Sequence, residues 1–240
     1  PDLGANAGLM PETHWSVVQR LGAEDTQCRD AAFAEVCRHY WQPLYSLARV
    51  LGRSPQDAED LTQAFLANLY RRRGLGEVNP ERGRFRSLLA AAFRNFSTDA
   101  LRRSNAQSRG GHLKRIPMNF AVAEVDFQAA QTHGLDPQRL FDRQWAQAIV
   151  NNAMQTCREE WVGKGRAPEF DALEPLLAPD PDAPGYAELG RRLGLSEANV
   201  ATKVKRLRDQ VGKHLRRAVA DTVLHPEEIR EELTYLIGLL

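Results

Sequence analysis

Apolar residues recur every three or four positions along most of the chain, and no segment shows the sustained alternation of β-branched residues that is typical of a strand. The most regular stripe lies between Phe85 and Phe96, where apolar side chains fall at steps of three, four, seven, eight and eleven. Such spacing places these side chains on one face of a helix. The pattern therefore predicts an all-α protein.

Four helices are predicted in the first half of the chain. They are a short helix capped by Thr13, a helix over about 30–51 bent by Pro43, a helix that begins at Pro55 after the cap residue Ser54, and a helix that begins at Phe85. A glycine-containing loop over 73–84 separates the last two. Because Phe85, Phe93 and Phe96 share the apolar stripe, we expect them in the core rather than as stacking platforms for bases.

The second half is predicted to hold a long helix over 137–161, a shorter one around 170–177, a helix-turn-helix over 186–208 and a last helix over 227–240. The two tryptophans of the long helix are expected in the core. The last helix places its leucines and isoleucines on one face and its acids on the other. We expect that face to pack on the second domain; capture by a regulator is the alternative.

These elements and the charge distribution predict two small helical domains joined by a long linker. The expected ranges are a disordered leader over 1–12, a first domain over 13–104, a flexible linker over 105–136, a second domain over 137–223 and a C-terminal amphipathic helix over 224–240. The formal net charge is only +1. Locally, however, 84–115 carries eight basic residues against one acid, whereas 119–182 carries eleven acids against five basic residues.

The segment 186–208 has the pattern of a helix-turn-helix. Gly190 stands where two helices cross closely, a place expected to tolerate little beyond glycine or alanine, and Gly194 makes the turn. Ser196 is expected to cap the second helix, since its hydroxyl can accept a bond from the first free backbone N–H groups. The buried stripe of that helix is predicted to be Val200, Val204, Leu207, Val211 and Leu215.

The face opposite this stripe is polar and basic, as in a helix that enters a major groove. Asn199, Thr202, Lys203 and Arg206 are placed to reach base edges. Lys205 and Arg208 are placed to reach phosphates, and Ser196 lies at the helix start. An ordinary amphipathic hairpin with a solvated basic face is the alternative interpretation.

Several function classes lack their sequence signals. There is no phosphate-binding glycine motif, no H-E-x-x-H and no nucleophile elbow, and the six histidines are scattered singly, so we expect no catalytic residues, no cofactor and no metal site. The three cysteines form no C-x-x-C pair, which favours a reduced cytoplasmic setting. No apolar run approaches the length of a membrane span and no signal peptide is visible, so a soluble cytoplasmic protein is expected.

Three sequence runs, in this order, carry a family resemblance: YWQPLYSLARVLGRSPQDAEDLTQAFLANLY, GRFRSLLAAAFRNFSTDALRR and YAELGRRLGLSEANVATKVKRLR. Together they resemble the bacterial sigma factors of the extracytoplasmic-function group over roughly 30–223. The D-A-E-D at 57–60, followed by Leu61, Gln63 and Phe65, is the most specific part. The opening THWSVV, the long middle helix and the end EEIREELTYLIGLL are similar to a long-linker branch of that group.

The resemblance implies that the first domain docks on core RNA polymerase and opens the −10 promoter element, while the helix-turn-helix reads the −35 element. Carried over to this chain, the polymerase-binding residues are Asp57, Glu59, Asp60 and Gln63. The residues that hold the −10 element are Arg84, Arg94, Asn95, Thr98, Arg102 and Arg103, with the loop over 74–84 as the pocket for an unstacked base. The alternatives are that the acids only cap their helix and that the arginines only form a solvated face.

The implied partners are core RNA polymerase and promoter DNA, with no membrane. Three alternatives stay open for the protein's regulation: an anti-sigma factor, phosphorylation by a Ser/Thr kinase, and control by its own tail. A stand-alone helix-turn-helix regulator and a protein that occupies polymerase without starting transcription are the rival functions. The acidic linker is expected either to mimic nucleic acid or to cover the basic faces before polymerase binds.

Overall fold

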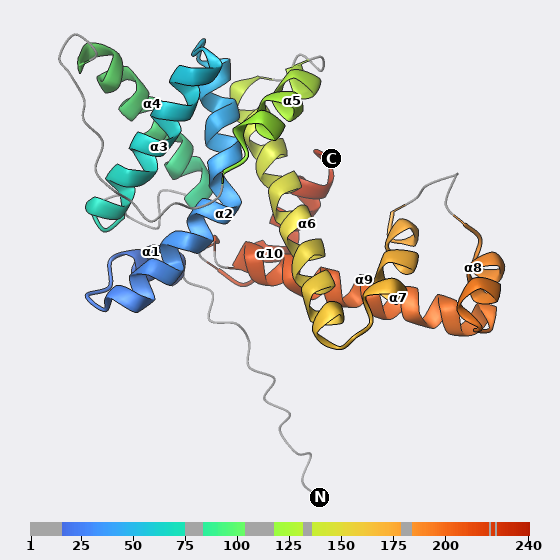
Figure 1. Ribbon diagram of the computed structural model, residues 1–240. Helices are drawn as coiled ribbons and strands as arrows, with labels where there is room; N and C mark the ends of the chain where they lie inside the picture. The colour runs from blue at the N-terminus through green and yellow to red at the C-terminus, as the bar shows by residue number, and fades with distance from the viewer. Residues whose placement is uncertain are drawn as a thin grey trace, which may run out of the picture. The chain divides into compact units, whose positions relative to one another are not determined.

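The computed structural model describes residues 16–74, 84–103, 118–131, 136–178, 184–220, 222–223 and 225–240. Every regular element in these ranges is helical, which confirms the all-α prediction (Figure 1). The elements are α1 (Ser16–Leu21), α2 (Thr26–Val50), α3 (Pro55–Arg71), α4 (Phe85–Arg103), α5 (Phe120–Gln131), α6 (Pro137–Gly163), α7 (Ala167–Leu173), the 3₁₀ turn η2 (Glu174–Leu176), α8 (Tyr186–Leu193), α9 (Glu197–Ala220) and α10 (Glu228–Ile237). The expected leader, the cap Thr13 and most of the glycine-containing loop lie outside the described residues.

The chain divides into two compact units, the first formed by Pro1–Ile149 with Ala218–Leu240 and the second by Val150–Arg217. These units do not coincide with the expected domain ranges. The start of α6 and the whole of α10 belong to the first unit, although the sequence pattern placed them in or beside the second domain.

Helix α2 is the centre of the first unit and contacts α1, α3, α4 and α5. It begins at Thr26, a few residues before the predicted start, because the Asp25 carboxylate accepts hydrogen bonds from the backbone N–H groups of Gln27 and Cys28. Pro43 lies inside the helix and is buried.

The apolar faces of α3 and α4 pack together. The predicted cap of α3 is present: the Asp57 backbone N–H donates to the Ser54 hydroxyl, with Pro55 at the first helical position. Phe85 and Phe93 are fully buried, and the rings of Phe65 and Phe93 meet edge to face at 5.1 Å. The core prediction is confirmed for Phe85 and Phe93, whereas Phe96 is only partly buried, with its ring against that of Phe65.

Helix α5 lies in the range expected to be a flexible linker, and here the structure differs from the expectation. The Arg49 guanidinium holds the Glu124 carboxylate through two bonds, Nε–Oε2 at 2.8 Å and Nη2–Oε1 at 2.9 Å. The Tyr45 hydroxyl donates to Glu124 at 2.7 Å, and Phe127 is buried beneath the Arg49 guanidinium. Helix α5 is thus anchored on α2 by the buried side chains of Ala123 and Phe127 together with charge-assisted bonds to Glu124.

The Glu124 anchor generates a prediction. Arg49 lowers the pKa of Glu124 from its ordinary 4.5 to about 2. Because the pKa is depressed in the folded state, the stabilisation is complete above the ordinary pKa and is lost as the pH falls toward 2. Glu124→Gln should lower the opening free energy of α5 by about 1–2 kcal/mol near neutral pH, with the difference from wild type shrinking between about pH 5 and about pH 2.

Amide hydrogen exchange across α5 measures this opening free energy. Asp126→Asn is the matched control: it removes the same charge from the same helix, but Asp126 is exposed and meets only the neutral Gln42 amide, at 2.7 Å. Equal losses of protection in the two variants would show that Glu124 is not the anchor.

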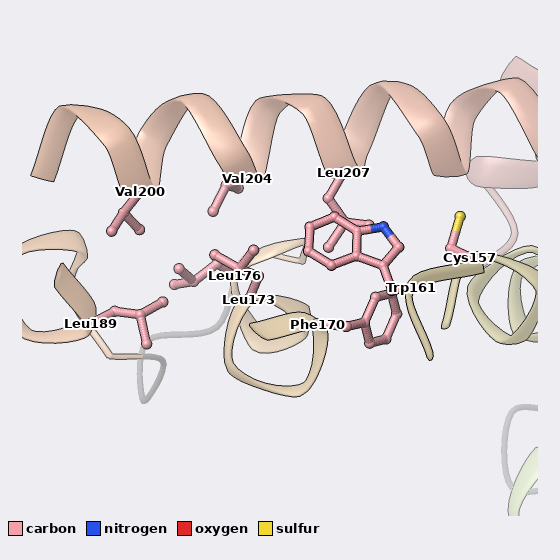
Figure 2. Packing of buried hydrophobic residues seen from close by; sticks show 9 residues of the cluster. All are labelled: Cys157, Trp161, Phe170, Leu173, Leu176, Leu189, Val200, Val204 and Leu207. Atoms are coloured by element: carbon pink, nitrogen blue, oxygen red, sulfur yellow. The ribbon is translucent and has the colours of Figure 1, made fainter. Parts of the chain in front are cut away.

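The second unit is built around an apolar cluster between α9 and the shorter helices. Figure 2 shows Val200, Val204 and Leu207 pointing from α9 toward the side chains that complete the cluster. These are Leu189 of α8, Phe170 and Leu173 of α7, Leu176, Trp161 and Cys157. The predicted stripe is therefore buried over its first three members, whereas Val211 and Leu215 are only partly buried.

The turn between α8 and α9 has the predicted geometry. Gly194 adopts the left-handed conformation (φ 67°), which favours glycine, and the Asn199 N–H donates to the Ser196 hydroxyl at 3.3 Å. A Cβ atom at Gly190 would lie 2.6 Å from the Leu195 carbonyl oxygen. The expectation that alanine would also fit at position 190 is therefore wrong, because real Cβ atoms do not approach backbone that closely.

Gly190→Ala should therefore destabilise the second unit, by about 1–3 kcal/mol. Gly212→Ala, in the middle of α9, is the control with the opposite sign: its nearest neighbour is the flexible Arg216 guanidinium at 3.4 Å, so relief of the glycine entropy should stabilise the helix by about 0.5–1 kcal/mol. Hydrogen exchange across α8 and α9 measures both effects. Equal stability of Gly190→Ala and wild type would contradict the close approach.

Candidate nucleic-acid interface

The first turns of α3 present the four residues that the resemblance assigns to polymerase. Asp57, Asp60 and Gln63 are exposed, and Glu59 is half-buried. The Ser54 hydroxyl donates to the Asp57 carboxylate at 2.7 Å, so Asp57 takes part in the cap while remaining open to solvent. The Gln63 amide donates to Glu59 at 3.2 Å. Capping and docking are thus compatible at Asp57, whereas Asp60 has an exposed carboxylate outside the cap.

Glu59 also borders a shallow hollow that the sequence did not indicate. The hollow is lined by Glu59 together with Met118, Asn119 and Phe120 at the start of α5. The Phe120 ring is held by Trp41 and Tyr45 of α2, with ring centroids at 5.2 and 5.4 Å. The α3 surface near Glu59 is therefore shared with α5.

Three predicted −10 residues lie on the described part of α4 with accessible side chains. Asn95 and Thr98 are exposed, and Arg94 is half-buried with its Nη2 donating to the Gln138 amide oxygen at 2.8 Å. The Thr98 hydroxyl donates to the Arg94 carbonyl oxygen at 3.0 Å. Arg102 and Arg103 belong to α4, but their side chains lie outside the described part of the structure.

Arg86 does not lie on the polar outer face of α4. Its side chain is only 3% exposed. Nε donates to Asp142 of α6 at 3.0 Å, and Nη1 donates to Glu232 of α10. The rings of Trp145 and Tyr235 also lie about the guanidinium. A buried guanidinium needs such partners, and they come from segments far away in the sequence.

Arg84, a predicted −10 residue, lies at the edge of the same charge cluster. Its Nε is 2.8 Å from Glu232 Oε2, and its Nη2 is 3.6 Å from the exposed Glu231. Arg84 Nε and Glu232 Oε2 form an ion pair but not a hydrogen bond. Oε2 is buried and accepts no hydrogen bond. Arg84 itself keeps 30% of its side chain exposed.

Helix α10 packs differently from the expectation. Its buried residues include Glu232 as well as Leu236, while Ile237 and Leu240, predicted on the packed face, are 62% and 48% exposed. Burial raises the pKa of Glu232, and Arg86 and Arg84 act against that rise. The Tyr235 hydroxyl donates to Asp142 at 2.9 Å. The expectation of an apolar packed face therefore holds for Leu236 but not for Ile237 and Leu240. The acid Glu232, expected on the outer face, is buried against Arg84 and Arg86.

The predicted reading face of α9 is only partly free. Asn199, Thr202, Lys205 and Arg206 are exposed, as is the cap Ser196. Lys203, however, is half-buried, and its Nζ lies 2.6 Å from the Glu169 carboxylate of α7. Arg208 is exposed but donates from Nη2 to the Leu176 carbonyl oxygen at 2.5 Å.

Glu169 is held by cations on two sides. Arg166 donates from Nε to it at 2.7 Å and lies over the Trp161 ring, with Cζ 4.3 Å from the centroid. The Arg166 hydrogen bond is the main cause of the lowered pKa of Glu169, and Lys203 adds to it. Glu169 therefore stays charged at neutral pH and keeps Lys203 beside α7.

The partners that sequence reasoning missed are the carboxylates Asp142, Glu169 and Glu232. Of the arginines and lysines that the structure describes beside them, only Arg166 has a local spacing, three positions along the chain from Glu169. The other cationic partners of these carboxylates lie far away in the sequence, up to 146 positions for Arg86 and Glu232. Within the described ranges, no three histidine, cysteine or acidic side chains gather as a metal site would require. No described helix is long and apolar enough to cross a bilayer.

Comparison with known proteins gives one family. Residues 36–107 match the model of Sigma-70 region 2, a range that includes α3, α4 and most of α2. No significant match was found among curated proteins or among solved structures. Sigma-70 region 2 implies binding to core RNA polymerase and to the −10 promoter element, and sigma factors are non-catalytic subunits of that enzyme. The chain thus carries a Sigma-70 region 2 domain over residues 36–107, the domain that marks sigma factors of the sigma-70 family.

Proposed function

We propose that this sigma factor belongs to the two-domain extracytoplasmic-function group, in its long-linker branch, and reads a −35 element with the helix-turn-helix of its second unit. The observation that carries the proposal is the α8–turn–α9 arrangement, with Gly190 of α8 at the close approach and Gly194 in the turn, in the same chain as a Sigma-70 region 2 domain. A region 2 domain supplies one promoter contact, and a separate helix-turn-helix unit supplies a second. Polymerase carries out the chemistry.

The exposed acids of α3 would dock on basic and polar groups of core polymerase. Asp57 and Asp60 support this role because both are exposed and lie in the first two turns of a helix, where the backbone dipole stabilises their negative charge. Gln63 follows one turn later on the exposed side. Glu59 would contribute at the border with α5.

At the −10 element, Asn95, Thr98 and Arg94 would meet the separated strand, with Arg84, Arg102 and Arg103 as further phosphate contacts. Opening a base step costs a few kcal/mol of stacking and pairing, which contacts to the freed strand offset. Exposed amide and hydroxyl groups beside a guanidinium on one helix provide such contacts. The phosphate contacts make binding strongly dependent on salt.

At the −35 element, the exposed residues Asn199, Thr202 and Arg206 would face bases, and Lys205 would reach a phosphate. Lys203 and Arg208 already have intramolecular partners, so we now assign them to holding α9 against α7 and η2 rather than to first contact with DNA. Because bacterial polymerase works in the cytoplasm, the proposed function places the protein there. An anti-sigma factor or a Ser/Thr kinase as regulator stays a prediction.

Run-off transcription with purified bacterial core polymerase tests the proposal. DNA fragments that co-purify with the polymerase-bound protein are sequenced and then used as templates. The protein should direct initiation from fragments that share two spaced elements, and changing either element should reduce the transcript. Transcription that depends on a −10 element alone would overturn the proposed role of the second unit.

Charge reversal on α3 tests the docking surface. Asp57→Lys with Asp60→Lys should lower the affinity for core polymerase by at least tenfold, because two attractive contacts become repulsive. Glu24→Lys with Glu174→Lys is the control, since both acids are exposed and lie outside α3. Holoenzyme assembly is measured by fluorescence anisotropy, and equal affinities for the two double variants would refute docking through α3.

Two substitutions on α9 separate a base contact from an internal contact. Arg206→Ala should weaken holoenzyme binding to a selected −35 duplex by about 1–3 kcal/mol and relax the preference at one base position. Lys203→Ala should change that affinity by less than a factor of about three and should instead lower the stability of the second unit, where its ion pair with Glu169 is lost. Electrophoretic mobility shift with single-base variants distinguishes them. A loss of base preference in Lys203→Ala would contradict this assignment.

A further inference from the structure

The start of α4 carries no excess of positive charge in the free protein, although its sequence is basic. Arg84 and Arg86 face three carboxylates within ion-pair distance, Asp142 of α6 and Glu231 and Glu232 of α10. Two positive charges therefore meet three negative ones at this place. The positive potential that the sequence predicts for promoter DNA is reduced here by the protein's own acids.

The two arginines hold different positions in this cluster. Arg86 is 3% exposed and donates hydrogen bonds to both carboxylates, so it is fixed inside the first unit. Arg84 is 30% exposed and reaches only α10 carboxylates, Glu232 at 2.8 Å and Glu231 at 3.6 Å. If Arg84 moves away, Glu232 keeps its hydrogen bond from Arg86. Arg84 is thus the exchangeable cation of the cluster.

The contact between Arg84 and Glu232 neutralises charge but does not fix the orientation of the Arg84 guanidinium. Glu232 Oε2 accepts no hydrogen bond, although Arg84 Nε is close to it. An orienting contact would use the directional N–H bond that a guanidinium offers to a carboxylate. A contact governed by charge alone can be replaced by another anion, and a DNA phosphate offers the same charge with more oxygen acceptors.

We propose that Glu232 is an internal substitute for a phosphate of the promoter strand: it occupies Arg84 in the free protein and gives it up when DNA is bound. Helix α10 thereby limits the affinity of the free sigma factor for DNA. The inference rests on the proposed contact of Arg84 with the −10 strand, and it adds a residue outside the Sigma-70 region 2 match to that site.

The test uses the full-length protein and a fluorescent single-stranded DNA of about 12 nucleotides and random sequence. Glu232→Gln should bind this DNA roughly fivefold more tightly than wild type at low salt, and the gain should disappear in the Arg84→Ala background. Glu231→Gln is the matched control, because it removes the same charge from the neighbouring position, where the carboxylate is 79% exposed. Its gain should be smaller. A gain that persists without Arg84, or equal gains at both positions, would overturn the proposal.

A second measurement does not depend on the variant folding. In wild type, the Nε–Hε resonances of Arg84 and Arg86 are followed by NMR during titration with the same DNA. Arg84 should shift and Arg86 should not, whereas shifts of both or of neither would contradict the exchange. Circular dichroism establishes that Glu232→Gln is folded.

Run-off transcription separates this inference from the proposed function. If wild type initiates transcription and Arg84→Ala reduces promoter opening, while Glu232→Gln leaves DNA binding unchanged, then only the inference on Glu232 fails. If Arg84→Ala has no effect on either DNA binding or opening, the proposed −10 contact of Arg84 fails with it. If Glu232→Gln leaves promoter opening unchanged but binds single-stranded DNA more tightly in a way that requires Arg84, the exchange takes place in the free protein and the inference is supported.

Discussion

The burial of the Arg86 guanidinium is the constraint on which the first unit depends. Removing one partner from a buried ion pair costs about 3–5 kcal/mol, so Arg86 requires both Asp142 and Glu232 in place. This requirement draws α6 and α10 onto α4, the helix that presents Asn95 and Thr98. The buried charge of Arg86 thereby fixes the position of α4, whose exposed side would contact DNA.

Structural features that depend on residues close together in the chain were predicted well from the sequence. Helical spacing identified the buried face of α4, and side-chain chemistry identified the caps Ser54 and Ser196 and the left-handed Gly194. These features follow from neighbours within a turn or two of helix. The exposed candidates on α3 and α9 followed from the same periodicity, since a residue opposite a buried stripe faces solvent.

The errors occurred where distant charges meet. Lys203 was assigned to a polar surface because its local spacing allowed it, yet its partner Glu169 lies on another helix. The burial of Arg86 against Glu232 depends in the same way on a distant helix. Helix α5 was taken for a linker although Phe120, Ala123 and Phe127 stand at helical spacing, because the helix that it packs on is 75 to 79 positions away in the chain. Gly190 is a steric example. The Leu195 carbonyl oxygen that crowds this position is placed there by the geometry of the turn, which the residue types alone do not reveal.

The pairing of Arg86 with Glu232 joins positions separated by 146 residues, with the whole second unit between them in the chain. On the ribosome, α4 emerges long before the acid that completes its surroundings. Because a buried guanidinium needs its carboxylate partners, the surroundings of α4 are complete only after the second unit has been synthesised.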